Sequence, residues 1–213
     1  MRQKTLLLHG WGGSDTPHWQ AWLAGEIAKN YGTVSFPLLD NPHFPSKNRW
    51  IKQVKALLNE FQPEVVICHS LGCSLWLHLC NEGEIVPVKR LLLVAPPRLT
   101  CELETLKSFF PLEAPTSLYA DEAILVTSDN DPYMSQEEAL ELQKALGVEM
   151  KVISNGGHLN ADSGYGEWPW VKEWVNLPSS SGLTRGSISQ NAQLDSPKGH
   201  FAHLCGNDEK AEK

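Results

Sequence analysis

The sequence predicts an α/β fold with a mostly parallel sheet of about six strands and helices on both faces. Short, nearly continuous apolar runs rich in Val, Ile and Leu alternate with longer segments of helical periodicity. This alternation is typical of parallel strands that are buried on both faces and joined by helices. The chain has 213 residues, enough for one domain with a sizeable core.

Each expected element follows from its apolar pattern. The strands are expected at Thr5–Leu8, Thr33–Phe36, Val65–Cys68, Leu91–Ala95, Ala123–Thr127 and Met150–Ile153. The helices are expected at His18–Asn30, Lys47–Phe61, Leu71–Asn81, Gln136–Leu146 and Trp170–Trp174. Between residues 96 and 121, the letters "SFF" and several prolines predict one short helix between loops. That stretch is too short for a large cap domain.

Composition excludes several classes of protein. The formal net charge is −7 and no Lys/Arg cluster stands out, which argues against nucleic acid and anionic membrane surfaces as partners. No apolar run approaches the roughly 20 residues that span a bilayer, and the three leucines before His9 are too few for a signal peptide. Five cysteines without regular spacing indicate free thiols in a reducing compartment. We therefore expect a cytoplasmic protein.

The composition changes after Leu177. Residues 178–213 contain scattered single apolar residues without a period, and such a segment buries too little surface to offset its ordering entropy. The sequence therefore predicts one domain over residues 1–177 and a disordered tail over residues 178–213. His200, His203 and Cys205 are of metal-ligand type, but no fourth ligand accompanies them, so we expect no metal site.

The segment "VVICHSLGCSLWLHLC" places Ser70 where a buried strand turns sharply into a helix. Such a turn holds the serine hydroxyl above the sheet, and it places the next amides at a helix N-terminus that stabilises negative charge. Gly72 meets the need for small residues in this crowded turn, whereas Cys68 stands where a glycine is more usual. The alternative is that Ser70 only caps the helix.

A base and an acid for Ser70 follow later strands. His158 lies in the glycine turn of "NGGHLNADSGYG", and "VTSDNDPY" carries Asp129 and Asp131. The chain order Ser, Asp, His is that of α/β-hydrolases, and each candidate follows the carboxyl end of a strand, where parallel sheets bind ligands. Either aspartate satisfies the residue pattern, and Asp131 before Pro132 is alternatively a simple turn former.

The loop after the first strand is expected to stabilise an oxyanion. Glycines in "LLLHGWGG" let the backbone approach a reacting carbonyl, and we expect the amides of Trp11 and Leu71 to be the two donors. His9 is expected to orient this loop by a hydrogen bond. His69 is expected to pack or hydrogen-bond locally, because it cannot easily point at its own neighbour Ser70.

Four motifs in order resemble the small serine α/β-hydrolases of the retinoblastoma-binding protein 9 family, particularly their bacterial members. The motifs are "LLLHGWGGSDTPHWQAWL", "VVICHSLG", "SDNDPY" and "GGHLNADSGYGEWPW". The resemblance spans Leu6 to about Trp174. It implies a minimal α/β-hydrolase fold without the first antiparallel strands or a large cap, a triad of Ser70, Asp131 and His158, and esterase-like or peptidase-like activity. Binding to the retinoblastoma protein is not expected, because "LTCEL" does not match the Leu-x-Cys-x-Glu pattern.

Tryptophans near the motifs are candidates for an apolar pocket. We expect Trp11 and Trp168 to contact substrate, whereas Trp19 and Trp22 fit core packing equally well. Cys68, Cys73 and Cys80 are expected to be buried packing residues.

The sequence thus predicts a serine hydrolase that cleaves small acyl esters through an acyl-enzyme, without a metal or organic cofactor. Two alternatives remain: an aminopeptidase-like or amidase-like hydrolase, and a non-catalytic binding protein on the same fold. The expected partner is a small-molecule ester or amide, and the pattern does not indicate an oligomeric state.

Overall fold

The computed structural model describes residues 3–83 and 85–177, so the expected tail and its His200, His203 and Cys205 lie outside the described residues. The strands are β1 (Lys4–Leu8), β2 (Thr33–Ser35), β3 (Val65–His69), β4 (Val88–Val94), β5 (Ala120–Ser128) and β6 (Glu149–Ile153). The α-helices are α1 (Trp19–Lys29), α2 (Lys47–Phe61), α3 (Leu71–Glu82), α4 (Gln136–Leu146) and α5 (Pro169–Asn176). Two short 3-10 helices lie at Glu104–Leu106 and Ala161–Ser163.

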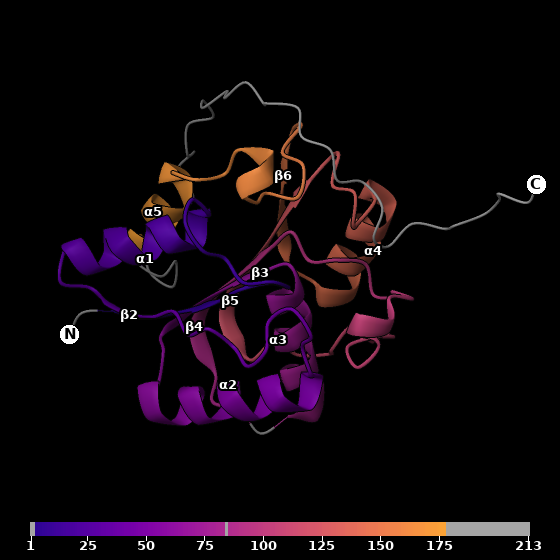
Figure 1. The fold of residues 1–213 in the computed structure, drawn as a ribbon, viewed down its shortest axis with the longest axis horizontal. Helices are drawn as coiled ribbons and strands as arrows, with labels where there is room; N and C mark the ends of the chain where they lie inside the picture. The colour runs from indigo at the N-terminus through magenta and orange to yellow at the C-terminus, as the bar shows by residue number, and fades with distance from the viewer. Residues whose placement is uncertain (1–2, 84, 178–213) are drawn as a thin grey trace, which may run out of the picture.

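The strands form one sheet (Figure 1). Their order is β2-β1-β3-β4-β5-β6, and all five neighbouring pairs are parallel. The chain runs from β1 outward to β2 and then returns to the other side of β1 as β3. The strand order therefore reverses between β1 and β3, and such switch points are where open parallel sheets bind ligands. The predicted fold class, a small α/β-hydrolase fold without a large cap domain, is confirmed.

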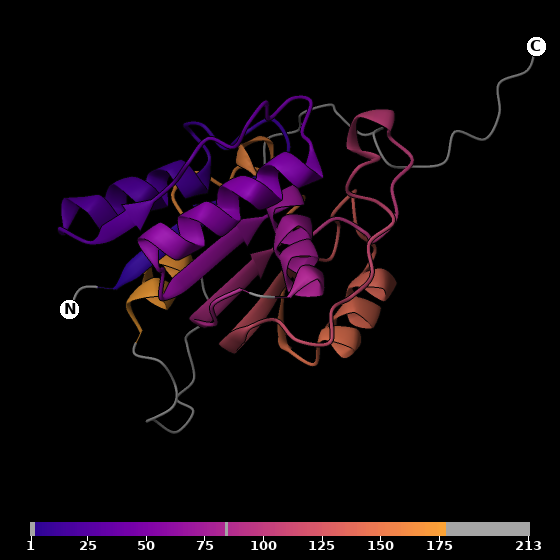
Figure 2. The same cartoon turned by 90° about the horizontal axis from the view of Figure 1, so that it is seen from below.

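Alternate residues of each strand feed two separate cores. Leu6, Leu8 and Val66 pack in one cluster with side chains of α2, α3 and α4. Leu7 and Ile67 pack in the other cluster, with side chains of α1 and α5. This period of two is that of a strand, whose successive side chains point to opposite faces. Helices α1 and α5 therefore cover one face, and Figure 2 shows α2 and α3 across the other.

Local signals set the ends of several helices. Ser135 and Glu138 form a capping box at the start of α4, and Gly147 ends that helix in the left-handed conformation. Pro169 occupies the first turn of α5. The β4–β5 connection differs from the rest, because it contains no α-helix among the described residues. Its 3-10 helix, Glu104–Leu106, lies just before the "SFF" segment where the short helix was expected.

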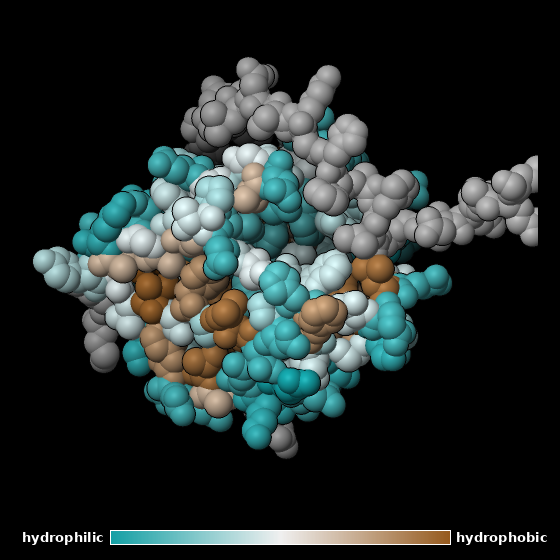
Figure 3. Space-filling view, viewed as in Figure 1, coloured by the Kyte–Doolittle hydropathy of each residue, from teal (hydrophilic) through white to brown (hydrophobic). Residues whose placement is uncertain are grey.

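The surface view in Figure 3 is mainly hydrophilic, with a group of hydrophobic side chains between α1 and α2. The edge strand β2 and its connection to α2 lie in this region (Figure 1), and Leu38 and Phe44 of that connection are exposed. None of the helices within the described ranges has the length and apolarity needed to cross a membrane. The same ranges contain no cluster of His, Cys, Asp and Glu suited to a metal ion.

Candidate active site

Ser70 occupies a strained turn between β3 and α3. Its φ of 51° and ψ of −123° are uncommon for a residue with a Cβ. Such a conformation costs about 1–3 kcal/mol and persists only where the surrounding structure imposes it. The Ser70 N–H donates to Val94 O at 3.0 Å, and its carbonyl accepts from Cys73 N at 2.8 Å. The turn is thus held on both sides, with its hydroxyl at the carboxyl edge of the sheet.

Two glycines make room for this turn. A Cβ on Gly72 would lie 2.6 Å from Leu8 O and 2.7 Å from His9 O. A Cβ on Gly10 would lie 2.8 Å from Ser70 Cβ. All three distances are shorter than packed atoms allow, and the atoms around Gly72 are main-chain atoms that cannot turn aside. The loop after β1 therefore packs against the Ser70 turn at a separation that only glycine permits.

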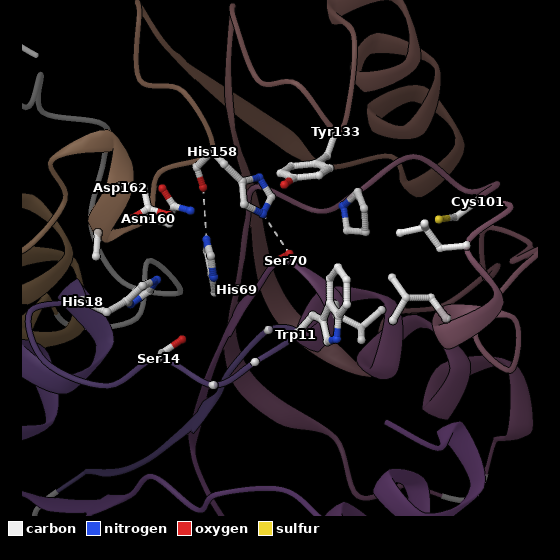
Figure 4. A pocket seen from close by; sticks show the side chains of 18 of the residues that line it. Trp11, Ser14, His18, His69, Ser70, Cys101, Tyr133, His158, Asn160 and Asp162 are labelled. Atoms are coloured by element: carbon white, nitrogen blue, oxygen red, sulfur yellow. Dashed lines mark hydrogen bonds between the residues drawn. The ribbon is translucent and has the colours of Figure 1, made fainter. Parts of the chain in front are cut away.

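The side chains of Ser70, His158 and Asp131 lie in a hydrogen-bonded line. His158 Nε2 is 2.8 Å from Ser70 Oγ, and His158 Nδ1 is 2.9 Å from Asp131 Oδ2 and 3.1 Å from Oδ1. Figure 4 shows the contact between His158 and Ser70. A carboxylate only accepts hydrogen bonds, so the imidazole proton lies on Nδ1 and Nε2 is left to accept from the serine hydroxyl. The Asp131 side chain is only 2% exposed.

The two aspartates after β5 have different partners. Asp131 Oδ1 accepts from Tyr133 N at 2.9 Å in addition to its contacts with His158. Asp129 accepts from Ser154 Oγ at 2.9 Å and from Asn155 N at 2.6 Å. Asp129 therefore ties the end of β5 to the loop after β6, and the structure brings Asp131, not Asp129, to the imidazole.

Two main-chain donors flank Ser70. Within the described residues, the N–H groups of Trp11 and Leu71 make no backbone hydrogen bond, and both residues line the cavity above Ser70. His9 holds the first of these loops: its Nδ1–H donates to Gly10 O at 2.7 Å and its Nε2 accepts from Leu39 N at 2.9 Å. This is the orienting contact that the sequence predicted for His9.

The cavity above Ser70 has a volume of about 310 Å³ and two chemically different halves. Figure 4 shows polar side chains on one side of Ser70 and apolar side chains on the other. The polar half is lined by Ser14, His18, His69, Asn160 and Asp162. The apolar half is lined by Trp11, Leu71, Pro97, Cys101, Leu103, Leu106 and Phe110. Ser70 therefore lies between two chemically different surfaces of one cavity.

Trp168 does not lie where the sequence analysis placed it. It is absent from the residues that line the cavity. Its ring packs edge-on against Trp19, at a centroid distance of 5.3 Å, and against Tyr165, at 5.0 Å. These contacts bury it in the core between α1 and α5, so the expectation that Trp168 contacts substrate is corrected. Trp11, by contrast, lines the cavity, and its Nε1–H donates to His43 O at 2.9 Å.

Several lining residues were missed in the sequence. Leu103, Leu106 and Phe110 come from the β4–β5 connection, where no periodic pattern was present to predict their direction. Ser14 and His18 lie in "GGSDTPHW". The only signal for them in the sequence was that both are polar and close to the glycine loop. Tyr133 follows the Asp-Pro pair and packs its ring against His158 at a centroid distance of 4.5 Å.

The cysteines close to Ser70 are inert packing groups. Cys68, Cys73 and Cys80 are free and buried. Burial raises the pKa of the Cys68 and Cys73 thiols well above the ordinary value, and it raises the pKa of Cys80 to about 12. A thiolate at any of these positions is therefore disfavoured at neutral pH.

The chain is similar to several known proteins along most of its length. It is 21% identical over 179 residues to the YdeN protein of Bacillus subtilis (strain 168), which covers 80% of this chain and 93% of that protein. The crystal structure of the B. subtilis ydeN gene product has a TM-score of 0.73 at 19% identity, covering 81% of this chain and 96% of that one. Est1E from Butyrivibrio proteoclasticus, solved with ferulic acid, has a TM-score of 0.59 at 14% identity, covering 81% and 86%.

At these low sequence identities, the similarity to the two solved structures establishes a shared fold and no more. The family relationship comes from the sequence family described as Serine hydrolase, which matches residues 5–176. That match takes in the five α-helices, the turn that carries Ser70, and all six strands except for Lys4 at the start of β1. The protein therefore belongs to the serine hydrolase family.

Proposed function

We propose that this enzyme is a carboxylesterase-like hydrolase that cleaves small acyl esters through a triad of Ser70, His158 and Asp131. The observation that carries this proposal is the line of contacts at 2.8 Å and 2.9 Å that joins Ser70 Oγ to His158 Nε2 and His158 Nδ1 to Asp131. A serine hydroxyl is a weak nucleophile until a neighbouring base accepts its proton. Here the base is in contact and oriented by a buried carboxylate.

The reaction follows from the positions of these groups. Ser70 Oγ forms a bond to the ester carbonyl carbon while its proton passes to His158 Nε2. The amides of Trp11 and Leu71 stabilise the oxyanion. The ester C–O bond then breaks, and His158 returns the proton to the departing alcohol. Water next attacks the acyl-enzyme with the same base, which releases the acid and restores the Ser70 hydroxyl.

The apolar half of the cavity supports an apolar acyl group as substrate. Leu106 and Phe110 are at most 9% exposed and line that half of the cavity together with Leu103. Each CH₂ of an acyl chain that is buried there contributes about 0.8 kcal/mol to the free energy of binding. We place the alcohol of the ester in the polar half of the cavity. That half borders the exposed Asp15 and Asp162, so a polar product can leave from it into water.

We also propose that, within the serine hydrolases, the chain belongs with the retinoblastoma-binding protein 9 group. The support is the order of its four motifs. The segments that contain Trp11, Ser70, Asp131 and His158 all contribute to one cavity or to the contacts that border it.

A fluorophosphonate probe and a series of p-nitrophenyl esters test the proposed function. The parent protein should be labelled once, and Ser70→Ala should lose both labelling and ester hydrolysis while keeping its circular dichroism spectrum. An anilide with the same acyl group, measured in parallel, separates an esterase from an amidase. Labelling that persists in Ser70→Ala, or hydrolysis of the anilide as fast as the ester, contradicts the proposal.

A further inference from the structure

The loop that carries His158 has an unfavourable main-chain conformation. Asn155, Gly157 and Leu159 all have positive φ values, of 53°, 55° and 49°. Glycine adopts such values freely and asparagine often, but a bulky residue such as leucine does so at a cost of about 1–3 kcal/mol. Contacts from outside the loop must therefore impose this conformation next to His158.

Side chains hold the main chain of the loop at several points, and three of these contacts are at His158 and Leu159. His69 Nε2 donates to His158 O at 3.1 Å, and Trp19 Nε1 donates to Leu159 O at 2.8 Å. The His158 N–H donates to Ser163 Oγ at 3.1 Å. Both polar main-chain groups of His158 are thus bonded to side chains. The contact from His69 comes from β3, 89 positions earlier in the chain.

His69 is suited to this contact because it is neutral. Burial, followed by the nearby His18 and His158, lowers the pKa of His69 well below the ordinary value. A neutral imidazole carries one proton, and the carbonyl oxygen of His158 requires that proton to be on Nε2. Nδ1 of His69 is therefore a bare acceptor.

His18 lies next to His69, on the side away from Ser70 and His158. Its Nδ1 accepts from Gln20 N at 3.1 Å, where it caps α1, and burial lowers its pKa to about 4. Its one proton is therefore on Nε2, which has no hydrogen-bond partner among the residues that the structure describes. The His18 and His69 ring centroids are 4.7 Å apart. Figure 4 shows His69 between His18 and the Ser70–His158 pair.

We propose that His69 is a positioning residue that holds the main chain of His158, and that His18 supports the His69 ring from behind. This inference rests on the proposed function of Ser70 and His158. His69 and Ser70 are consecutive residues at the end of β3. The end of β3 therefore presents the Ser70 hydroxyl. Through His69 it also holds the main-chain carbonyl of His158, the residue that accepts the hydroxyl proton in the proposed reaction. A misplacement of about 1 Å between such groups costs roughly 10²-fold in rate.

Amide substitutions at position 69 test the contact with matched side chains. In His69→Gln the amide nitrogen takes approximately the place of Nε2, whereas in His69→Asn it takes approximately the place of Nδ1. Both are uncharged, and His69→Leu removes the donor altogether. We expect His69→Gln to keep kcat within about fivefold of the parent. His69→Asn and His69→Leu should lower kcat by about 10- to 100-fold with KM within about threefold.

Two readouts separate positioning from a loss of fold. Fluorophosphonate titration gives the number of active sites, so kcat is expressed per labelled site. Hydrogen exchange of residues 154–163 reports the loop itself, without reference to activity. Exchange should be faster in His69→Leu and His69→Asn than in His69→Gln. Equal exchange in all three variants would overturn the role of His69. So would variants in which fewer sites are labelled while kcat per labelled site stays that of the parent.

The support by His18 has its own test. His18→Asn keeps an acceptor for the Gln20 N–H, and asparagine is a good helix cap, but it removes the ring against His69. We expect kcat to fall about three- to tenfold with KM within about threefold of the parent. Adding His18→Asn to His69→Leu should cost nothing further, because coupled residues are not additive. Losses that multiply would overturn the support by His18. A parent protein that the probe does not label contradicts the proposed function, whereas the exchange experiment still decides the contact.

Discussion

Asp129 and Asp131 differ in what their carboxylates hold, although both follow β5. Asp131 contacts His158 Nδ1, while Asp129 accepts from Ser154 and Asn155. Asp131→Asn would present an amide to Nδ1, which favours the imidazole tautomer with its proton on Nε2. That nitrogen then cannot accept from Ser70. We expect kcat/KM to fall by at least about 10²-fold, or roughly 2.7 kcal/mol.

The neighbouring change is the matched control. Asp129→Asn keeps an acceptor oxygen for the loop after β6 and should cost less than about tenfold. Both variants are measured on one p-nitrophenyl ester, with circular dichroism to verify the fold. If Asp129→Asn proves more damaging than Asp131→Asn, the acid has been assigned to the wrong carboxylate.

Gly72 and Gly25 provide a second comparison between single residues. A Cβ on Gly72 would lie within 2.7 Å of two main-chain oxygens, whereas Gly25 in α1 has nothing within 4 Å of the same position. Gly72→Ala should therefore lower the free energy of unfolding by about 2–3 kcal/mol. It should also displace the loop that carries Trp11, so kcat/KM should fall more than tenfold.

Gly25→Ala should be neutral or stabilise the protein by up to about 1 kcal/mol, because alanine is the better helix former. Urea unfolding gives both free energies. A Gly72→Ala protein as stable and active as Gly25→Ala would show that the loop after β1 is free to move away from Ser70.

At the scale of elements, the sequence predicted every strand and α-helix of the described fold, and it missed some of their ends. It placed the start of the fourth strand at Leu91, whereas β4 begins at Val88 and includes Lys89 and Arg90. Charged residues interrupted the apolar run that served as the signal. Strand pairing depends on main-chain hydrogen bonds, which charged residues also make, so an apolar pattern underestimates a strand whose first residues are charged.

Arg90 shows why such a residue is tolerated. It is 1% exposed, and its Nη1 donates to Trp174 O at 2.7 Å and to Leu177 O at 2.9 Å. Its guanidinium lies 4.0 Å from the centroid of the Trp174 ring, a cation–π contact. Arg90 thus joins the sheet to the end of α5, which no local pattern in the sequence reports.

This connection predicts a large effect on stability. Arg90→Leu leaves two carbonyls at the end of α5 without this donor, so the free energy of unfolding should fall by about 2–3 kcal/mol. Lys89→Ala, which removes an exposed ion pair to Glu64, should change it by less than about 1 kcal/mol. Chemical denaturation of the two variants distinguishes them. Equal losses would mean that the end of α5 does not depend on Arg90.

At the scale of the whole molecule, parallel topology explains how much of the candidate site could be predicted. In a parallel sheet the carboxyl ends of all strands meet at one edge, so turn residues after β1, β3, β5 and β6 indicated one site without knowledge of the structure. The path of the chain above that edge has no such rule. Trp168 and Phe110 are both aromatic residues in irregular segments, but only Phe110 reaches the cavity. That difference is set by tertiary packing.

The whole molecule should also lose stability in mild acid. Burial lowers the pKa of His9, His18, His69 and His78 below 6.5. Between the folded and unfolded pKa values the unfolded chain binds more protons, so the free energy of unfolding falls as the pH falls below about 6.5. For His18, with a folded pKa of about 4, this loss amounts to about 2 kcal/mol between pH 7 and pH 5.

Urea unfolding of the parent at pH 7, 6 and 5, at constant ionic strength, should give a free energy of unfolding that declines steadily. His18→Asn keeps the cap of α1 but has no group that titrates, so its decline between pH 7 and pH 5 should be about 2 kcal/mol smaller than that of the parent. The free energy of unfolding falls in acid because the unfolded chain takes up a proton at His18 at a higher pH than the folded protein does. An equal decline in both proteins would mean that His18 accepts its proton without unfolding, and the ring would then not be held as a neutral donor beside His69.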